Sequence, residues 1–445
     1  MKHKLILNKV LFALLALLFA GAASAQESRT ITLKEAVDLT LAYNKTLKND
    51  SSKIKEASAA ITEAKERRLP DASVTGAGLF LPVKPSIDLK TGGNSNGGSG
   101  GSAPPRVSEA FYGIASVSLP VYTAGKLKYG IESAQFLEQA IKLDADNDRS
   151  LIILNSINAC INLYKAYQAI ALVKENLETS QQRVKDLTNL EKNGLLARND
   201  LLKAELQSSN IELSLLDAQS NYKIACVNMN LMMGLPEQTE LIPDRSGLAL
   251  PTSIKTLEDY EQGALKGRKD VEALSIRKKA AALGVKTAKA GYYPNIALTG
   301  GYIAADIPKF LTITNAVNIG VGVKYDIASL WKTKTRIQQA QFKVDQLQNN
   351  QSMLDDNIRL QINQAYLAYL VSEKKIDVYN KAVEQATENY RITKNKYDNA
   401  LATTTELLDA DVVLFQTKLS VTNAKADSFL AYNKLLQIAG ELDKY

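Results

Sequence analysis

The chain has 445 residues and a formal net charge of +7, and its only histidine is His3. A lone histidine at the N-terminus excludes enzymes and metal sites that depend on imidazole groups in the folded protein. The small charge gives no indication of nucleic-acid binding. Because the sequence also lacks a nucleophile motif, we expect neither catalytic residues nor a cofactor.

The first 25 residues have the features of a secretory signal peptide. Three lysines precede an apolar run over residues 10–20, and Ala23-Ser24-Ala25 forms a small-residue cleavage site. Cleavage would remove these lysines, so the formal charge would fall from +7 to +4 over 420 residues. The new first residue, Gln26, is not a cysteine, and a lipid anchor is therefore not expected. No later stretch of 18 residues is free of strongly polar groups, so we expect no transmembrane helix.

Glycine and proline divide the rest of the chain into two similar halves. Residues 131–233 contain one glycine, Gly194, residues 323–439 contain none, and neither stretch contains proline. Both residue types interrupt helices, so each stretch is predicted to be a long helical hairpin. Apolar residues at heptad spacing support this prediction. They are Leu163, Ile170, Leu177 and Val184 in the first half, and Ile362, Tyr369, Ile376, Val383, Tyr390 and Tyr397 in the second.

The two halves are related by constant offsets in residue number. Residues 114–235 match 320–441 at an offset of 206, and residues 32–70 match 256–294 at an offset of 224. The difference of 18 residues is an insertion in the first half that contains the glycine-rich run 91–102, which is predicted to be a surface loop. Each half is predicted to begin with a helix, near 33–68 and 256–290.

The predicted organisation therefore has four parts. A signal peptide, 1–25, is followed by a first repeat, 26–235, with strands near 72–82 and 107–119 and a long hairpin at 123–233. A linker, 236–255, leads to the second repeat, 256–441, with strands near 295–304 and 315–325 and a long hairpin at 328–439.

The predicted strands alternate apolar and polar side chains. The clearest is 315–325, in which Val317, Ile319, Val321 and Val323 alternate with polar or small residues. Lengths of about 9 to 11 residues suit tilted strands that cross a bilayer. Four strands cannot close a barrel, so a membrane barrel would require several copies of the chain. A soluble four-stranded sheet at the end of a helical rod is the alternative.

The two cysteines, Cys160 and Cys226, both lie in helical sequence of the first half. They could pair across a hairpin that turns near residue 195, because their midpoint is 193. We favour the alternative of two buried, unpaired thiols.

Several duplicated phrases resemble a known family. TLKEAVDLTLAYNKTLK lies near the start, RRLPDASVTG and GYYPNIALTGG enter predicted strands, LPVYTAGKLKYGIESAQ leaves one, and NGLLARNDLLKAELQ and NALATTTELLDADVV lie at the hairpin turns. From about residue 31 to 441 the chain resembles the TolC-type outer-membrane efflux proteins. The resemblance implies a mainly α protein with a membrane β-barrel. In this homotrimer, four strands per protomer contribute to a 12-stranded barrel in the outer membrane, and duplicated long α-helical hairpins form an α-barrel in the periplasm.

The resemblance also implies a function and partners. The protein would be an exit duct for efflux or type I secretion, coupled through a periplasmic adaptor (membrane fusion) protein to an inner-membrane transporter. It would contact outer-membrane lipid and no nucleic acid. The alternative function is a periplasmic coiled-coil adaptor or scaffold without a membrane barrel.

The family's periplasmic mouth corresponds to the two hairpin turns. Matching residue by residue, the resemblance places an acidic pore constriction at Glu406 and Asp409, whose spacing of three puts them on one helix face. Glu406 also completes a capping box with Thr403, and Asp409 could lie on an ordinary solvated face. The two roles of Glu406 are compatible.

The resemblance places gate contacts between the hairpins at Asp200 and Tyr397. The family's arginine at this contact corresponds to Ala402, which cannot make it. The tip residues are apolar or small where a solvated turn favours polar ones. They would dock the adaptor, or else only close each hairpin, and they are Gly194, Leu195, Leu196, Ala400 and Leu401.

Overall fold

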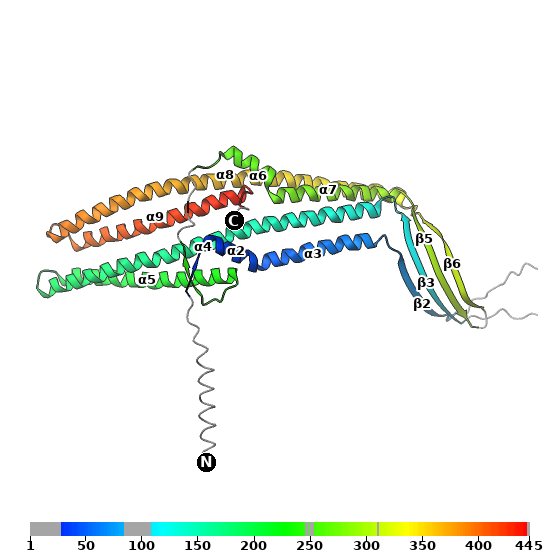
Figure 1. Cartoon of the computed structure of the whole chain (residues 1–445), viewed down its shortest axis with the longest axis horizontal. Coiled ribbons are helices and arrows are strands. Elements are labelled where there is room, and N and C mark those ends of the chain that lie inside the picture. The colour runs from blue at the N-terminus through cyan, green and yellow to red at the C-terminus, as the bar shows by residue number, and fades with distance from the viewer. Residues whose placement is uncertain (1–27, 84–107, 245–248, 250–252, 309–310, 443–445) are drawn as a thin grey trace, which may run out of the picture. The chain divides into compact units, whose positions relative to one another are not determined.

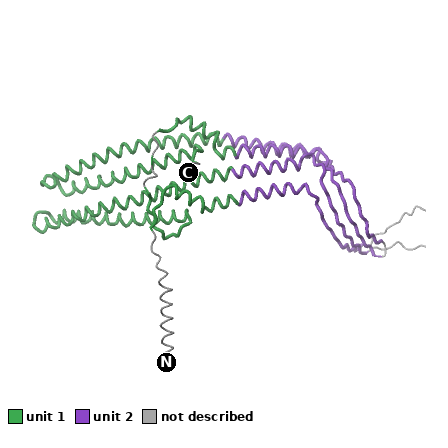
Figure 2. Tube along the Cα trace, viewed as in Figure 1, with its two compact units in different colours: residues 1–51, 143–272, 353–445 green, residues 52–142, 273–352 purple. Residues whose placement is uncertain are grey.

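The structure is a computed structural model that describes residues 28–83, 108–244, 249, 253–308 and 311–442. The predicted signal peptide and the glycine-rich run 91–102 lie outside the described residues. The chain forms two compact units (Figure 2). Unit 1 contains residues 1–51, 143–272 and 353–445, and unit 2 contains residues 52–142 and 273–352.

Helices make up most of the described chain, and the two predicted long hairpins are present as α4–α5 and α8–α9 (Figure 1). The longest helices, α4 and α8, have 67 and 70 residues, which corresponds to roughly 100 Å each. Within the described ranges, none of the helices has an apolar stretch long enough to cross a membrane. The helices are α2 Leu33–Tyr43, α3 Lys45–Glu66, α4 Lys126–Lys192, α5 Arg198–Met233, α6 Leu257–Gly267, α7 Lys269–Lys289, the short 3-10 helix η1 Ala290–Tyr292, α8 Ser329–Asp398 and α9 Thr404–Ile438.

The internal duplication is visible in where the helices begin and end. Helices α5 and α9 begin at residues 198 and 404, an offset of 206, and α2 and α6 begin at residues 33 and 257, an offset of 224. The ends of α5 and α9 are also equivalent, because Gly234 and Gly440 both adopt the left-handed backbone conformation with φ of 72° and 74°. The two repeats therefore share their helix boundaries as well as their sequence pattern.

Each predicted N-terminal helix is divided into two helices. Asn44 has an extended ψ of 127° and ends α2. Its side-chain oxygen accepts hydrogen bonds from the backbone N–H groups of Thr46, at 2.8 Å, and Leu47, at 3.3 Å, so it also caps the start of α3. Arg268, with ψ of 134°, separates α6 from α7 in the second repeat. The prediction of one uninterrupted helix near 33–68 and another near 256–290 was wrong at these two residues.

Unit 2 contains an antiparallel four-stranded sheet with the order β2-β3-β5-β6. Figure 1 shows the four strands side by side in this order. Within the described residues, β2 and β6 each have one edge without a partner strand. The strands are β2 Asp71–Phe80, β3 Glu109–Tyr122, β5 Asn295–Ile307 and β6 Leu311–Lys324.

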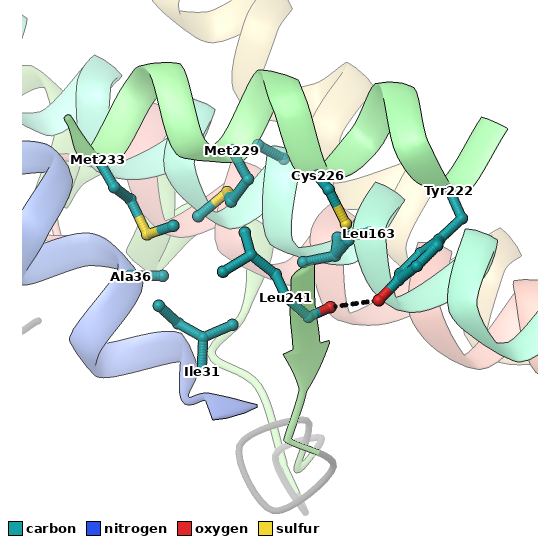
Figure 3. Packing of buried hydrophobic residues seen from close by; sticks show 9 residues of the cluster. Ile31, Ala36, Leu163, Tyr222, Cys226, Met229, Met233 and Leu241 are labelled. Atoms are coloured by element: carbon teal, nitrogen blue, oxygen red, sulfur yellow. Dashed lines mark hydrogen bonds between the residues drawn. The ribbon is translucent and has the colours of Figure 1, made fainter. Parts of the chain in front are cut away.

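A second, smaller sheet in unit 1 was missed by the sequence analysis. β1 (Ser28–Ile31) pairs in parallel with β4 (Glu240–Pro243), which lies in the predicted linker 236–255. Strands of four residues are too short for an alternating pattern to reveal them. Two of their side chains, Ile31 and Leu241, are buried against α2, α4 and α5 (Figure 3).

The two cysteines belong to this same core cluster and are free thiols. Cys226 is buried, and Cys160 packs against the cluster from α4. Burial raises the pKa of Cys160 to about 12. The neighbouring Tyr222 hydroxyl donates a hydrogen bond to the carbonyl oxygen of Leu241 at 2.9 Å (Figure 3). The structure therefore agrees with the alternative of unpaired thiols.

Two glycines at equivalent positions in turns allow a matched stability test. A Cβ atom at Gly234 would lie 2.7 Å from two ring carbons of Tyr43, whereas a Cβ at Gly194 would meet nothing within 4 Å. Both glycines have left-handed backbones, which cost a non-glycine residue about 1–2 kcal/mol. We expect Gly194→Ala to show only this cost and Gly234→Ala to lose more, because Tyr43 must move. Denaturant unfolding in detergent, followed by circular dichroism, measures both, and equal losses would contradict the predicted contact.

Candidate functional site

The two hairpin turns have the same backbone geometry. Gly194 and Ala400 adopt φ of 74° and 57°. The N–H of Leu195 donates to the carbonyl of Leu190 at 2.9 Å, and the N–H of Leu401 donates to the carbonyl of Lys396 at 2.7 Å. These six-residue bonds define a Schellman motif at the end of each long helix. The left-handed residue is glycine in the first turn and alanine in the second.

The predicted tip residues divide into two groups. Leu195 and Leu401 are 74% and 76% exposed, and Gly194 and Ala400 are also exposed. Leu196 instead packs against the buried cluster of Leu187, Leu201 and Ala204. Leu196 therefore closes its own hairpin, as the alternative reading expected, while the other four residues are free to meet a partner.

Glu406 completes the capping box that the sequence predicted. Its Oε2 atom accepts hydrogen bonds from the backbone N–H of Thr403 at 2.6 Å and from the Thr403 hydroxyl at 2.9 Å. The Thr403 hydroxyl oxygen accepts the N–H of Glu406 at 3.2 Å. The bond from the Thr403 backbone N–H, the bond from its hydroxyl and the nearby positive charge of Lys396 lower the pKa of Glu406.

Glu406 and Asp409 lie on one exposed face of α9. The residues between and beside them, Leu407, Leu408 and Asp411, are buried on the other face. The predicted spacing of three therefore places both carboxylates together, where they make no core contact. Capping uses one oxygen of Glu406 and leaves its charge at the surface.

The structure brings the hairpins together near Asp200 and Tyr397, although through other contacts than the predicted one. Asp200 is bonded to Lys203 at 3.2 Å, and Lys203 reaches across to the hydroxyl of Thr405 at 3.2 Å. The hydroxyl of Tyr397 lies 3.5 Å from that of Thr404, and its ring packs against the Leu187 cluster of the first hairpin. Within the described residues no bond joins Asp200 to Tyr397.

A buried ion pair that the sequence analysis missed joins three helices near the hairpin turns. Arg183 of α4 donates hydrogen bonds to a carboxylate oxygen of Asp411 of α9 at 2.8 Å and to the hydroxyl of Tyr390 of α8 at 3.1 Å. The side chains of Arg183 and Asp411 are only 10% and 11% exposed. We call these three residues the Arg183 cluster.

The electrostatics of the Arg183 cluster favour the charged pair. Burial alone would lower the pKa of Arg183, but the hydrogen bond and charge of Asp411, together with Tyr390, hold it above its ordinary value. Losing one partner of such a buried pair leaves an uncompensated charge. One signal of this site was visible in the sequence. Tyr390 belongs to the heptad series of the second half, and Arg183 directly precedes Val184 of the series in the first half.

Two further ion pairs continue the contact between α4 and α9. Lys165 pairs with Asp427, and Glu175 pairs with Lys418 at 3.3 Å. As residue numbers rise along α4 they fall along α9, so that the two numbers of each pair add to between 592 and 594. The helices are therefore antiparallel and in constant register. Apolar residues, including Ile153, Ile157 and Phe429, fill the same contact further from the turns.

Comparison with known proteins agrees with this architecture. The family described as Outer membrane efflux protein matches residues 36–235 and 261–441. The Outer membrane efflux protein BepC of Brucella suis biovar 1 (strain 1330) is 23% identical over 299 residues. That match covers 66% of this chain, and the chain spans 64% of the relative's length.

Solved structures show the same fold. The outer membrane protein VceC of Vibrio cholerae has a TM-score of 0.72 at 17% identity, with 92% of this chain and 96% of that chain covered. The CmeC outer membrane channel of Campylobacter jejuni has a TM-score of 0.73 at 17% identity, with 92% and 86% covered. The predicted fold class, a mainly helical protein with strands of a membrane barrel, is confirmed. The matched family consists of channel proteins and not of enzymes. Because the family model matches both repeats with their duplicated hairpins, the chain belongs to the outer membrane efflux protein family.

Proposed function

We propose that three copies of this protein form an exit duct in the outer membrane for an efflux or type I secretion system. The observation that most supports it is that one protomer leaves two kinds of surface uncovered. Among the described residues, both edges of its sheet lack a partner strand, and two of its long helices expose apolar stripes. Further copies of the same chain would cover both.

Over much of its length the four-stranded sheet has one apolar and one polar face, although Ile114 and Ile303 pair on the otherwise polar face. Strand register places Leu298 of β5 between Val321 of β6 and Leu119 of β3, and two residues away Ile296 lies between Val323 and Tyr122. On the opposite face, register aligns polar or small residues across all four strands: Asn318, Gly301, Ser116 and Ser73 in one row, and Gly320, Thr299, Ser118 and Asp71 in the next. Strands that face lipid on one side and water on the other alternate in this way.

The unpaired edges of β2 and β6 favour an assembly of several chains. In a membrane, free backbone N–H and C=O groups at a sheet edge would lack hydrogen-bond partners. Four strands are too few to close, whereas three copies would supply 12. The alternative of a soluble adaptor or scaffold does not account for valine and isoleucine side chains of β6 that are 66–89% exposed on one face.

Helices α5 and α8 expose apolar residues at helical spacing. We call these the α5 stripe and the α8 stripe. Unpaired stripes of this kind on long helices indicate coiled-coil contacts with another chain. The α5 stripe comprises Leu202, Leu206, Leu213, Leu216, Ile224, Val227 and Leu231, and the α8 stripe comprises Met353, Leu360, Leu367, Leu370, Val371, Val378 and Ile392.

The hairpin turns would dock a periplasmic adaptor that connects the duct to an inner-membrane transporter. Leu195 and Leu401 are the most exposed apolar side chains of the two turns, and a hairpin end of another protein would bury them. BepC is named as an efflux protein, which supports export as the function here.

The mouth of the duct would combine an acidic ring with the Arg183 cluster. Three copies would bring together six carboxylates from Glu406 and Asp409, which attract cations and repel anions. The Arg183 cluster ties α9 to α4 within each protomer. Lys203 adds a contact across the hairpins to Thr405. Opening the mouth by moving α9 away from α4 would break these bonds.

Fractionation of cells tests the function itself. We expect the protein in the outer-membrane fraction, released only by detergent, because the apolar face of the sheet needs lipid. Recovery as a soluble monomer without detergent would reject the duct and favour the adaptor or scaffold.

Cation selectivity tests the acidic ring. We expect Glu406→Gln combined with Asp409→Asn to move the reversal potential of bilayer-reconstituted channels in a salt gradient toward zero, because the ring loses its negative charge. Glutamine still completes a capping box, so the start of α9 should remain intact. A matched control is Glu178→Gln with Asp398→Asn, because these two acids line a cavity with Leu407, on the buried side of α9. Equal reversal potentials for wild type and ring variant would reject the assignment.

Single-channel conductance tests the closure of the mouth. We expect Asp411→Ala to raise conductance most, because it leaves Arg183 buried without its carboxylate, a loss of about 3–5 kcal/mol in comparable pairs. Asp200→Ala should raise conductance less, since the side chain of Asp200 is 31% exposed and bonded only through Lys203 to the second hairpin. Asp427→Ala, at the exposed end of the same contact, is the control. A larger effect from Asp200 than from Asp411 would place the closing contact at Asp200 instead.

A further inference from the structure

We propose that α5 of one protomer packs antiparallel against α8 of the next in the same register that α4 and α9 adopt within a protomer, and that Glu212 and Lys381 form an ion pair across this subunit interface. The inference rests on the proposed trimer and specifies which residues meet in it.

The register follows from the internal duplication. Helix α8 repeats α4 and α9 repeats α5, both at an offset of 206. Three copies with two repeats each would place six similar hairpins around one axis, so the contact between protomers would resemble the contact within one. Moving from α4 to α8 adds 206 to one residue number, and moving from α9 to α5 subtracts 206 from the other. Residues that face each other between protomers would therefore also have numbers that add to between 592 and 594.

The exposed apolar residues provide an independent check of this register. At a sum of 594 it places Leu202 opposite Ile392, Leu216 opposite Val378, Ile224 opposite Leu370, and Val227 opposite Leu367. These eight side chains are 37–64% exposed in the protomer. The register was derived from ion pairs that involve none of these eight residues. It nevertheless places an apolar residue of the α5 stripe opposite one of the α8 stripe in four positions.

Sliding one helix by a turn reduces the match to three apolar pairs in one direction, where Leu206, Val227 and Leu231 would face Ile392, Val371 and Leu367, and removes it in the other. A shift of four residues in this second direction would place Leu202 opposite Glu388, Leu216 opposite Lys374 and Val227 opposite Asn363. Apolar side chains would then face charged or polar groups and lose the burial that stabilises a coiled coil. The chain thus favours the duplicated register, clearly over one adjacent register and by four apolar pairs to three over the other.

The Glu175–Lys418 pair has a counterpart of reversed polarity in the proposed interface. Adding 206 to residue 175 gives Lys381 on α8, and subtracting 206 from residue 418 gives Glu212 on α5. Both side chains are exposed. In the described part of the chain neither forms an ion pair or a hydrogen bond. An acid and a base at these equivalent positions, each without a partner in its own protomer, are complementary across the interface.

The other two ion pairs do not have an ion pair as their counterpart. Arg183 and Asp411 correspond to Asn389 and Glu205, and Lys165 and Asp427 correspond to Val371 and Asn221. The interface between protomers would therefore depend on apolar contacts and one ion pair, whereas the contact within a protomer has three. Near the mouth, Arg183 would pair only with Asp411 of its own protomer.

Disulfide crosslinking tests the register. In a background of Cys160→Ala and Cys226→Ala, we expect the pair Leu216→Cys and Val378→Cys to link neighbouring chains under mild oxidation into covalent dimers and trimers on non-reducing gels. The control pair Leu216→Cys and Leu370→Cys uses two residues of the same stripes, but lies eight residues out of register, or about 12 Å along the helix. It should give at least tenfold less product.

Charge reversal tests the ion pair separately. Lys381→Glu places like charges together in each of three interfaces and should reduce the trimer fraction several-fold in detergent, as measured by light scattering after gel filtration. Adding Glu212→Lys should restore it. Glu384→Lys, a reversal three residues away that the same register places opposite the uncharged Asn210, should leave the trimer unchanged.

The possible outcomes separate the two proposals. A wild-type protein that is monomeric in detergent would reject the trimer itself. A stable trimer that crosslinks through the 216–370 pair and not the 216–378 pair would leave the duct standing and overturn the register. Failure of Glu212→Lys to rescue Lys381→Glu in a folded protein would overturn the ion pair.

Discussion

A helix of roughly 100 Å in a thin wall can bury only the side chains that face another helix, and this constraint explains most of the structure. In this protein α4 and α9 cover each other, with Ile153, Ile157, Ile161 and Phe429 buried between them. Helices α5 and α8 keep apolar stripes that no part of the described protomer covers. A single chain therefore cannot satisfy its own hydrophobic pattern, and association with further copies would complete it.

The sheet of unit 2 follows the same rule. Its valine and isoleucine rows would be stable in lipid, and its serine, threonine and asparagine rows in water. Near the turns, polar contacts supplement the apolar packing around Leu187. The Arg183 cluster supplies a directional contact that breaks as a unit, whereas hydrophobic contacts weaken gradually with separation. Such a contact suits a mouth that must be either held or released.

Much of the fold could be predicted from sequence because it depends on local and periodic features. Long stretches without glycine and proline predicted the hairpins, and the constant offset of 206 reappears in the helix boundaries. The capping box at Thr403 and Glu406 is local and was predicted correctly. The breaks at Asn44 and Arg268 were missed because a single capping residue leaves the apolar period almost unchanged.

The candidate site was harder to predict, because its contacts join residues far apart in the chain. Arg183 and Asp411 are 228 positions apart, and only the register of α4 on α9 makes them neighbours. The resemblance suggested Asp200 and Tyr397 as direct partners, but Asp200 bonds to Lys203, which reaches Thr405, and the hydroxyl of Tyr397 lies beside that of Thr404. Positions of exposed residues such as Leu195 and Glu406 depend mainly on helix phase, so they could be anticipated.

The central claim is that one protomer is an incomplete part of a ring. Native mass spectrometry of the protein extracted from outer membranes in detergent measures this directly, since it counts the chains in each particle. We predict particles of three chains, in agreement with four strands per protomer and a barrel of 12. A population of single chains that retains the helical content of the extracted protein would contradict the account.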